Sequence, residues 1–443
     1  MKPDAAFKAY DIRGLYPDEI DQELAHRVAR AYVAIDGIRR ILVARDMRAS
    51  SEPLSTAFIT GALEQGADVI DLGVASTDLL YFASGARDLP GVVFTASHNP
   101  AGYNGIKLCR AGAKPIGAES GLAEIKELVV SGAFPPPPRL GRVSTEDLLP
   151  AYVEHCHRQI DLATLKPLKI VVDAGNGMAG LTVPAVFADL PIEVVPLYFE
   201  LDGTFPNHPA DPIQPENLAD LRAAVVEHGA ACGLAFDGDA DRVFFVDEQG
   251  EPVSASLLGA MVADQILAQH PGEKVVYSLT CSRIVRETIE RAGGIPVRTR
   301  VGHSYIKAVM AETGAIFGTE HSGHFYFRDH FNADCGMLAA LHALSVISQA
   351  GSCSAALAPY RVYWHSGEVN SEVADKAAAT QRVRAAFADG RHDETDGLTV
   401  EYDDWWFNLR ASNTEPLLRL NLEHASWDAG PERTARLLEL IRA

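Results

Sequence analysis

The chain has 443 residues, with 47% apolar and 22% charged side chains, which is the composition of a globular protein of about three domains at roughly 150 residues each. Its formal net charge of −20 disfavours partners that need a basic field, namely nucleic acid and anionic membranes, but still allows a small anionic substrate in a locally basic pocket. No apolar run reaches the ~20 residues that span a bilayer, and Met1 to Gly14 lack the apolar core of a secretory signal, so we expect a cytoplasmic protein. The six cysteines form no CxxC pair and do not support a zinc site.

Three stretches of the chain repeat one order of elements, in which short β-branched runs alternate with segments of helical period. The predicted strands are 41–46, 67–73 and 91–100 in the first stretch, 169–174, 192–198 and 233–242 in the second, and 274–279, 295–300 and 315–324 in the third. The clearest helical segments between them are 216–229, 281–294 and 304–314. This βαβ pattern predicts parallel strands and right-handed crossovers in each unit.

Breaks in the pattern divide the chain into four predicted domains, 1–150, 151–253, 254–365 and 366–443. The first break is the run of four prolines at 135–138, which neither a helix nor a central strand accommodates. The last domain has a different order, namely strand, helix, three strands and a final helix. That order predicts an antiparallel sheet with helices on one face.

In each repeat the third strand ends in a polar loop, at the edge where α/β sheets bind ligands. The first loop contains Ser97, a residue type that ordinarily closes a turn or caps a helix. No GxSxG elbow is present, which argues against an acyl-transfer triad. Neighbouring side chains generally point to different places, so we do not pair His98 with Ser97 as its base. A nucleophilic Ser97 therefore needs another activator.

The second loop carries three carboxylates within five residues, Asp237, Asp239 and Asp241. Packed together they repel one another unless they are protonated or bind a cation, and hard oxygen ligands suit Mg²⁺ or Ca²⁺. A solvated acidic turn is the alternative. An EF-hand is rejected, because Arg242 stands where that loop requires glycine and both flanks are strand-like. Since Mg²⁺ keeps positions open for phosphate oxygens, the loop predicts a phosphoryl ligand.

The third loop and the last domain add polar groups of the kind that bind sugar phosphates. Glu320 and Ser322 lie two residues apart and can face one side of an extended loop, and His324 can move protons near neutral pH. A structural loop explains this pattern equally well. In the last domain, a planar guanidinium precedes three small polar side chains, and these residues are Arg410, Ser412, Asn413 and Thr414. This combination suits a phosphate-binding turn, and a simple polar turn is the alternative.

Together the motifs TASHNP, DGDADR, EHSGH and RASNTEP, with YDIRG near the start, resemble the α-D-phosphohexomutase superfamily in order and spacing over nearly the whole chain. The resemblance implies three related α/β domains with mixed, largely parallel sheets and a smaller TATA-binding-protein-like α+β domain around a central cleft. It implies a Mg²⁺-dependent mutase acting on phosphorylated mannose or glucose through a phosphoserine and a hexose 1,6-bisphosphate, which also serves as activator. No nucleic-acid or membrane partner is implied.

The resemblance also assigns residues. It places the phosphoserine on Ser97 and the Mg²⁺ ligands on Ser97, Asp237, Asp239 and Asp241. Sugar binding falls on Glu320 and Ser322, and distal phosphate binding on Arg410, Ser412, Asn413 and Thr414. Groups near the transferring phosphoryl are Arg13, Lys107 and Arg242, and further cleft residues are Tyr10, His303 and His324.

Thr319 stands where many relatives have glycine before the glutamate, and His321 occupies a position that varies between subfamilies, which puts the sugar in question more than the reaction. The alternatives are a phosphoglucosamine mutase, a Mg²⁺-dependent sugar phosphatase and a non-catalytic sugar-phosphate sensor. An intact Ser97 and three carboxylates argue against the sensor, which needs no nucleophile.

Overall fold

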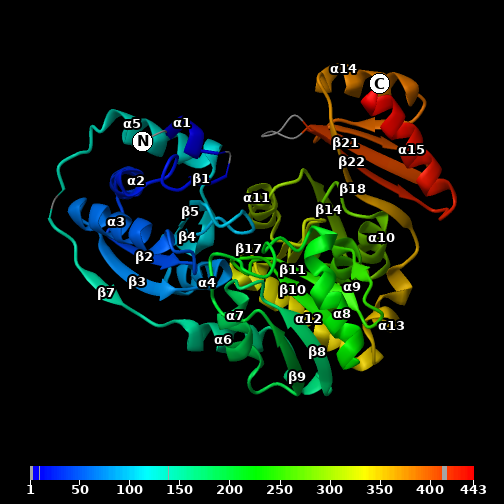
Figure 1. Cartoon of the computed structure of the whole chain (residues 1–443), viewed down its shortest axis with the longest axis horizontal. Coiled ribbons are helices and arrows are strands. Elements are labelled where there is room, and N and C mark those ends of the chain that lie inside the picture. The colour runs from blue at the N-terminus through cyan, green and yellow to red at the C-terminus, as the bar shows by residue number, and fades with distance from the viewer. Residues whose placement is uncertain (1–2, 9, 138, 412–416) are drawn as a thin grey trace.

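The computed structural model of the chain describes residues 3–8, 10–137, 139–411 and 417–443. The first unit, blue and cyan in Figure 1, lies at one end of the molecule. Its strands are β1 (Ile12–Leu15), β2 (Arg40–Arg45), β3 (Asp68–Val74), β4 (Gly91–Phe94), β5 (Tyr103–Arg110), β6 (Lys114–Pro115) and β7 (Val143–Thr145). Its helices are α1 (Pro3–Ala6), α2 (Gln22–Asp36), α3 (Ser51–Glu64), α4 (Thr77–Arg87) and α5 (Leu122–Ser131). The strands form one sheet in the order β1-β5-β4-β2-β3-β7, with β6 beside β5.

The second and third units each contain a five-stranded sheet. The second unit consists of β8 (Leu168–Asp173), β9 (Ile192–Leu197), β10 (Cys232–Phe236), β11 (Val243–Asp247) and β12 (Pro252–Val253), with α6 (Leu149–Arg158), α7 (Ala179–Phe187) and α8 (Ala219–His228). The third consists of β13 (Lys274–Ser278), β14 (Ile295–Thr299), β15 (Phe317–Thr319), β16 (Phe325–Phe327) and β17 (Ala333–Asp334), with α9 (Ala255–Gln269), α10 (Arg283–Arg291), α11 (His303–Thr313), α12 (Gly336–Ala350) and α13 (Cys353–Leu357). Their strand orders are β12-β11-β10-β8-β9 and β14-β13-β15-β16-β17.

All three sheets are mixed, as the resemblance implies. The predicted repeat strands form a parallel trio in each unit, and each trio continues into antiparallel strands that the repeat pattern does not predict. The third strand of each trio pairs with its successor, β4 with β5, β10 with β11 and β15 with β16. The three loops singled out by the sequence are therefore the connections within these antiparallel pairs.

The C-terminal unit, orange and red in Figure 1, stands at the opposite end from the first. It consists of β18 (Trp364–Glu372), β19 (Arg391–Asp393), β20 (Leu398–Glu401), β21 (Trp405–Ala411) and β22 (Leu417–His424), with α14 (Lys376–Ala386) and α15 (Ala429–Arg442). The sheet is wholly antiparallel, in the order β18-β22-β21-β20-β19. Both helices pack on it, with Val383 and Leu437 buried in one cluster with Leu420. The predicted α+β architecture is confirmed.

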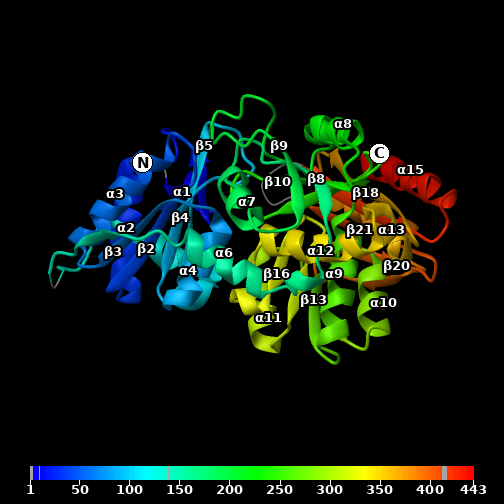
Figure 2. The same ribbon diagram turned by 90° about the horizontal axis from the view of Figure 1, so that it is seen from below.

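Burial joins the first three units and separates the fourth. One apolar cluster runs from Leu42 on β2 through Ile170 on β8 to Val275 on β13. The second view shows these units side by side (Figure 2). The fourth unit has its own core and meets the third through polar contacts, since Arg283 donates to the carbonyls of Asp403 and Trp405 at 2.8 and 3.0 Å.

Among the described residues, no one helix has the length and apolar composition to cross a membrane. The segments 336–350 and 353–360 meet those criteria only when taken together, and they are bent by 101°.

Candidate functional site

Ser97 lies in the loop between β4 and β5, where its side chain faces the second unit. Its backbone is left-handed, with φ 52°, and its amide donates to Thr95 Oγ1 at 2.9 Å. Its Oγ donates to Asp237 Oδ2 at 2.7 Å, and only 5% of the residue is exposed. His98 Nδ1 lies 3.2 Å from the same Oγ. Our expectation that these neighbours point apart was wrong, because the left-handed turn at Ser97 brings them together.

The three carboxylates of the second loop converge in the interior. Asp237 and Asp239 are fully buried and Asp241 is 2% exposed, and one oxygen from each lies within 4.8 Å of the others. Within the described residues, Asp239 Oδ1 and Asp241 Oδ1 have no hydrogen-bond partner. Buried acceptors without donors are costly, and a divalent cation bound by oxygen would satisfy both. The residues present therefore fit a hard divalent metal ion.

Two cationic side chains neutralise this acidic group. Lys107 Nζ lies 2.6 Å from Asp239 Oδ2 and 2.8 Å from Asp241 Oδ2, and Arg242 Nε donates to Asp237 Oδ2 at 2.9 Å. Burial lowers the pKa of Lys107, but the two carboxylates outweigh it and hold the pKa well above its ordinary value. Burial raises the pKa of Asp237 despite Arg242. The site thus carries fixed positive charge around oxygens that can accept a metal.

Arg13 joins this site from β1. Its guanidinium donates to Asn99 Oδ1 at 2.7 Å and to the Ala96 carbonyl at 3.3 Å, and it pairs with Asp11 at 2.5 Å. Arg13 therefore binds the Ser97 loop, and its side chain is still partly exposed.

In the third loop, Glu320 already has partners for both oxygens. Tyr326 donates its hydroxyl to Oε2 at 2.5 Å, and the Gly302 amide donates to Oε1 at 2.9 Å. Ser322 Oγ lies 3.0 Å from His324 Nδ1. These contacts hold the Glu320 carboxylate in place and orient the His324 imidazole.

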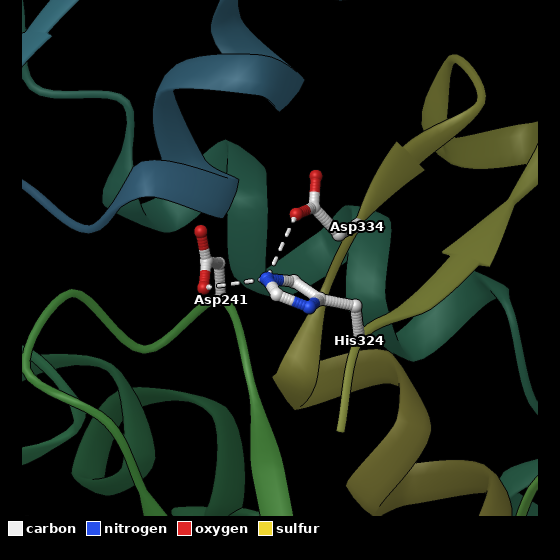
Figure 3. A group of neighbouring side chains, drawn as sticks. All are labelled: Asp241, His324 and Asp334. Atoms are coloured by element: carbon white, nitrogen blue, oxygen red, sulfur yellow. Dashed lines mark ion pairs between the residues drawn. The ribbon is translucent and has the colours of Figure 1, made fainter. Parts of the chain in front are cut away.

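His324 stands between two buried carboxylates from different units (Figure 3). Its Nε2 lies 3.7 Å from Asp241 Oδ1 and 3.8 Å from Asp334 Oδ2. Asp334 in turn pairs with Lys307, whose Nζ is 2.5 Å from Oδ1 and 3.8 Å from the centre of the Tyr81 ring. The second and third units therefore meet at this histidine.

A cavity of about 380 Å³ opens beside these loops. Predicted residues from three units line it, namely Tyr10, Glu320, Ser322, His324 and Arg410. His303 packs against the Tyr10 ring with centroids 5.3 Å apart, and burial, reinforced by Lys307, holds its pKa well below the ordinary value.

Arg410 lines the same cavity from β21. Its guanidinium lies 3.7 Å from Asp396 and 3.9 Å from Glu368, which also lies 3.4 Å from Arg419 on the neighbouring strand. The other predicted members of this phosphate-binding group, Ser412, Asn413 and Thr414, lie outside the described residues.

The structure adds functional candidates that carry little or no signal in a single sequence. Thr77 donates to Asp239 Oδ2 at 2.6 Å from the start of α4, and Asp334 reaches His324 from β17. Arg48 is buried behind the Ser97 loop. Only Arg48 has a possible signal, since it follows the first repeat strand at its carboxyl end.

Known proteins resemble this chain over nearly its whole length. Four models described as phosphoglucomutase/phosphomannomutase match in order, alpha/beta/alpha domain I at 4–135, domain II at 150–250, domain III at 255–363 and the C-terminal domain at 368–439. A phosphomannomutase of Salmonella montevideo is 40% identical over 450 residues, covering 99% of each chain. A protein of Xanthomonas campestris named phosphohexose mutases is 42% identical over 444 residues, again covering 99% of each.

A solved phosphoglucomutase/phosphomannomutase family protein from Burkholderia thailandensis superposes with a TM-score of 0.89, at 32% identity and with 100% of this chain and 98% of that one covered. The fold and these relatives together define a mutase with three α/β units and a C-terminal α+β unit, an enzyme of the isomerase class. The chain belongs to the phosphoglucomutase/phosphomannomutase family.

Proposed function

We propose that this protein interconverts hexose 1-phosphates and hexose 6-phosphates through a phosphorylated Ser97 and a hexose 1,6-bisphosphate. The observation that carries the proposal is the 2.7 Å contact between Ser97 Oγ and Asp237, inside a carboxylate cluster that fits a divalent cation. Mg²⁺ held by Asp237, Asp239 and Asp241 would supply charge neutralisation for the phosphoryl group.

In the first half-reaction the bond between phosphorus and Ser97 Oγ breaks, and a new bond forms between phosphorus and a free sugar hydroxyl. We expect His324 to accept the hydroxyl proton, because its ring is oriented by Ser322 and borders the cavity. The departing Ser97 Oγ takes up a proton within the buried site and returns to the hydroxyl form, with Asp237 Oδ2 2.7 Å and His98 Nδ1 3.2 Å away. Arg242 and Lys107 offset the negative charge on the phosphoryl oxygens. After the bisphosphate reorients, the same bonds form and break in reverse at its other end.

The groups away from the chemistry bind the rest of the substrate. Glu320 and Ser322 would accept and donate hydrogen bonds to sugar hydroxyls, with Tyr10 beside them on the cavity wall. Arg410 would anchor the phosphate that is not reacting, through the planar fork that suits phosphate oxygens. Ser412, Asn413 and Thr414 are proposed to complete that anchor.

We propose mannose and glucose phosphates as substrates, with hexose 1,6-bisphosphate as activator. Relatives at 40% and 42% identity carry the names phosphomannomutase and phosphohexose mutases, which favours mannose and leaves room for a second hexose. Coupled assays that compare mannose 1-phosphate, glucose 1-phosphate and glucosamine 1-phosphate under identical conditions will rank the sugars. Release of inorganic phosphate in place of isomerised sugar would identify a phosphatase.

The test of the phosphoserine is Ser97→Ala, with the exposed Ser131→Ala as control. Removing a nucleophile should lower kcat about a thousandfold or more and leave the unfolding transition in place. Phosphopeptide mapping of the wild-type protein after incubation with hexose 1,6-bisphosphate should locate phosphate on Ser97. Stable phosphate only on another serine, or an active Ser97→Ala protein, would refute the proposed mechanism.

A further inference from the structure

Arg48 is a fully buried guanidinium with an acceptor for each of its five N–H donors. Its Nε donates to Asp46 Oδ2 at 3.2 Å. The remaining donors reach four backbone carbonyls at 2.7 to 3.1 Å, those of Ser97, Asn99, Pro100 and Tyr103. One side chain thus binds three carbonyls of the connection between β4 and β5, including that of the proposed nucleophile, and the carbonyl of the first residue of β5.

The partner carboxylate is itself fixed. Asp46 Oδ1 accepts from the Arg48 amide at 2.9 Å and from Ser51 Oγ at 2.5 Å, so it is anchored to the start of α3. The guanidinium therefore cannot shift without breaking bonds to the helix and to the loop together. Burying a charge is costly. That cost is understandable where five donors in one rigid plane have to hold a loop in a single geometry.

The second unit packs against Arg48 and the Ser97 loop from the opposite side. The Phe205 ring centre lies 4.9 Å from the guanidinium carbon, and a Cβ on Gly203 would stand 2.5 Å from Arg48 Cα. In the metal loop, a Cβ on Gly238 would stand 2.4 Å from the Ser97 carbonyl oxygen. That oxygen is therefore held between the guanidinium of the first unit and the acidic loop of the second.

We propose that Arg48 is a positioning residue for Ser97. It fixes the left-handed turn that points the Ser97 Oγ toward the carboxylate cluster, and it couples this orientation to the packing of segment 203–205 of the second unit. Arg48 touches neither the substrate cavity nor the Oγ, so it acts through the loop. The inference rests on the proposed role of Ser97 as phosphoryl carrier. Its consequence is that the rate of phosphoryl transfer, and not sugar-phosphate binding, depends on this guanidinium.

The test is Arg48→Lys, which keeps the buried charge beside Asp46 but offers three donors in place of five. Arg45→Lys, on β2 and paired with Asp71 at 3.7 Å, is the matched control. Both proteins are charged with hexose 1,6-bisphosphate, and transfer from the phosphoenzyme to mannose 1-phosphate is followed in a single turnover. Because misplacing reacting groups by about 1 Å can cost a hundredfold, we expect Arg48→Lys to transfer roughly 10–100-fold more slowly with an unchanged KM. The control should transfer at the wild-type rate.

A purely structural arginine would lower the melting temperature without changing the transfer rate per folded molecule. That result, a change confined to KM, or loss of the cooperative unfolding transition in Arg48→Lys would overturn the proposal. Failure of the proposed function is seen separately, since wild-type protein would then carry no phosphate on Ser97. Wild-type phosphorylation with a normal transfer rate in Arg48→Lys would remove only the role of Arg48.

Discussion

Among the three carboxylates of the second loop, Asp239 offers the clearest test of metal binding by a single substitution. One of its oxygens accepts from Thr77 and Lys107, and the other has no protein donor among the described residues. Burial raises its pKa, but the lysine and the threonine outweigh burial and hold the pKa below its ordinary value, so the group is an anion. Asp239→Asn should weaken Mg²⁺ binding at least about tenfold and lower turnover with it, because one anionic ligand becomes neutral. Titration of activity against Mg²⁺ measures this, with the exposed Asp428→Asn as control. Full activity in excess chelator would contradict the assignment.

The sequence predicted the site residues that lie in loops of unusual composition. Ser97 and the three carboxylates stand at strand ends, where the repeat itself directs attention, and the structure brings them together. Asp334 and Arg48 were missed for a physical reason. A lone acid on a short strand and a lone arginine after a strand look ordinary, and their importance arises from contacts across 10 and 49 positions of the chain.

At the scale of elements, periodicity predicted strands that parallel neighbours cover on both sides, such as β8 and β13. It also predicted amphipathic helices such as α10 (Arg283–Arg291). It did not distinguish parallel from antiparallel pairing, because β11 is buried at every position just as β10 is. Burial on both faces removes the alternation of apolar and polar residues that identifies a half-exposed strand. The direction of such a strand relative to its neighbour therefore has to be inferred from the loop that connects them.

The loop after β10 gives a prediction at this scale. A Cβ on Gly238 would stand 2.4 Å from the Ser97 carbonyl oxygen, which is closer than atoms can approach, so Gly238→Ala must push the β10–β11 connection away from the β4–β5 connection. We expect kcat to fall by roughly 10–100-fold with the fold retained, since two reacting groups separate. The matched control is Gly102→Ala in the same β4–β5 connection, where the nearest atom lies 3.8 Å away. Steady-state kinetics and thermal unfolding of both variants test this prediction. An unchanged kcat in Gly238→Ala would show that the two loops are not held by this contact.

At the scale of the whole molecule, the first three units meet around buried polar groups as well as through their common core. Asp78 on α4 accepts from Tyr152 on α6 at 2.5 Å and from Cys335 of the third unit at 3.2 Å. Burial raises the pKa of Asp78 to about 6. Close by, His155 on α6 lies 3.0 Å from His330 of the third unit and 4.8 Å from the Phe82 ring of the first. Buried titratable groups therefore lie at the junction of the three units.

This histidine pair predicts how stability changes with pH. Burial lowers the pKa of His155 to about 4 and that of His330 to about 3, so both rings are neutral in the folded protein. The unfolded chain takes up their protons below about pH 6.5, so stability present above that pH is lost as pH falls toward 4, at up to about 1.4 kcal/mol per pH unit for each ring. Urea unfolding between pH 7 and 5 measures the slope, to which Asp78 contributes with the opposite sign because its pKa is raised to about 6. His155→Gln should remove from the wild-type slope roughly the share of one histidine. The exposed His228→Gln serves as control and should keep the wild-type slope. If His155→Gln leaves the slope unchanged, the pair is not buried in neutral form and the junction between the units is held by other groups.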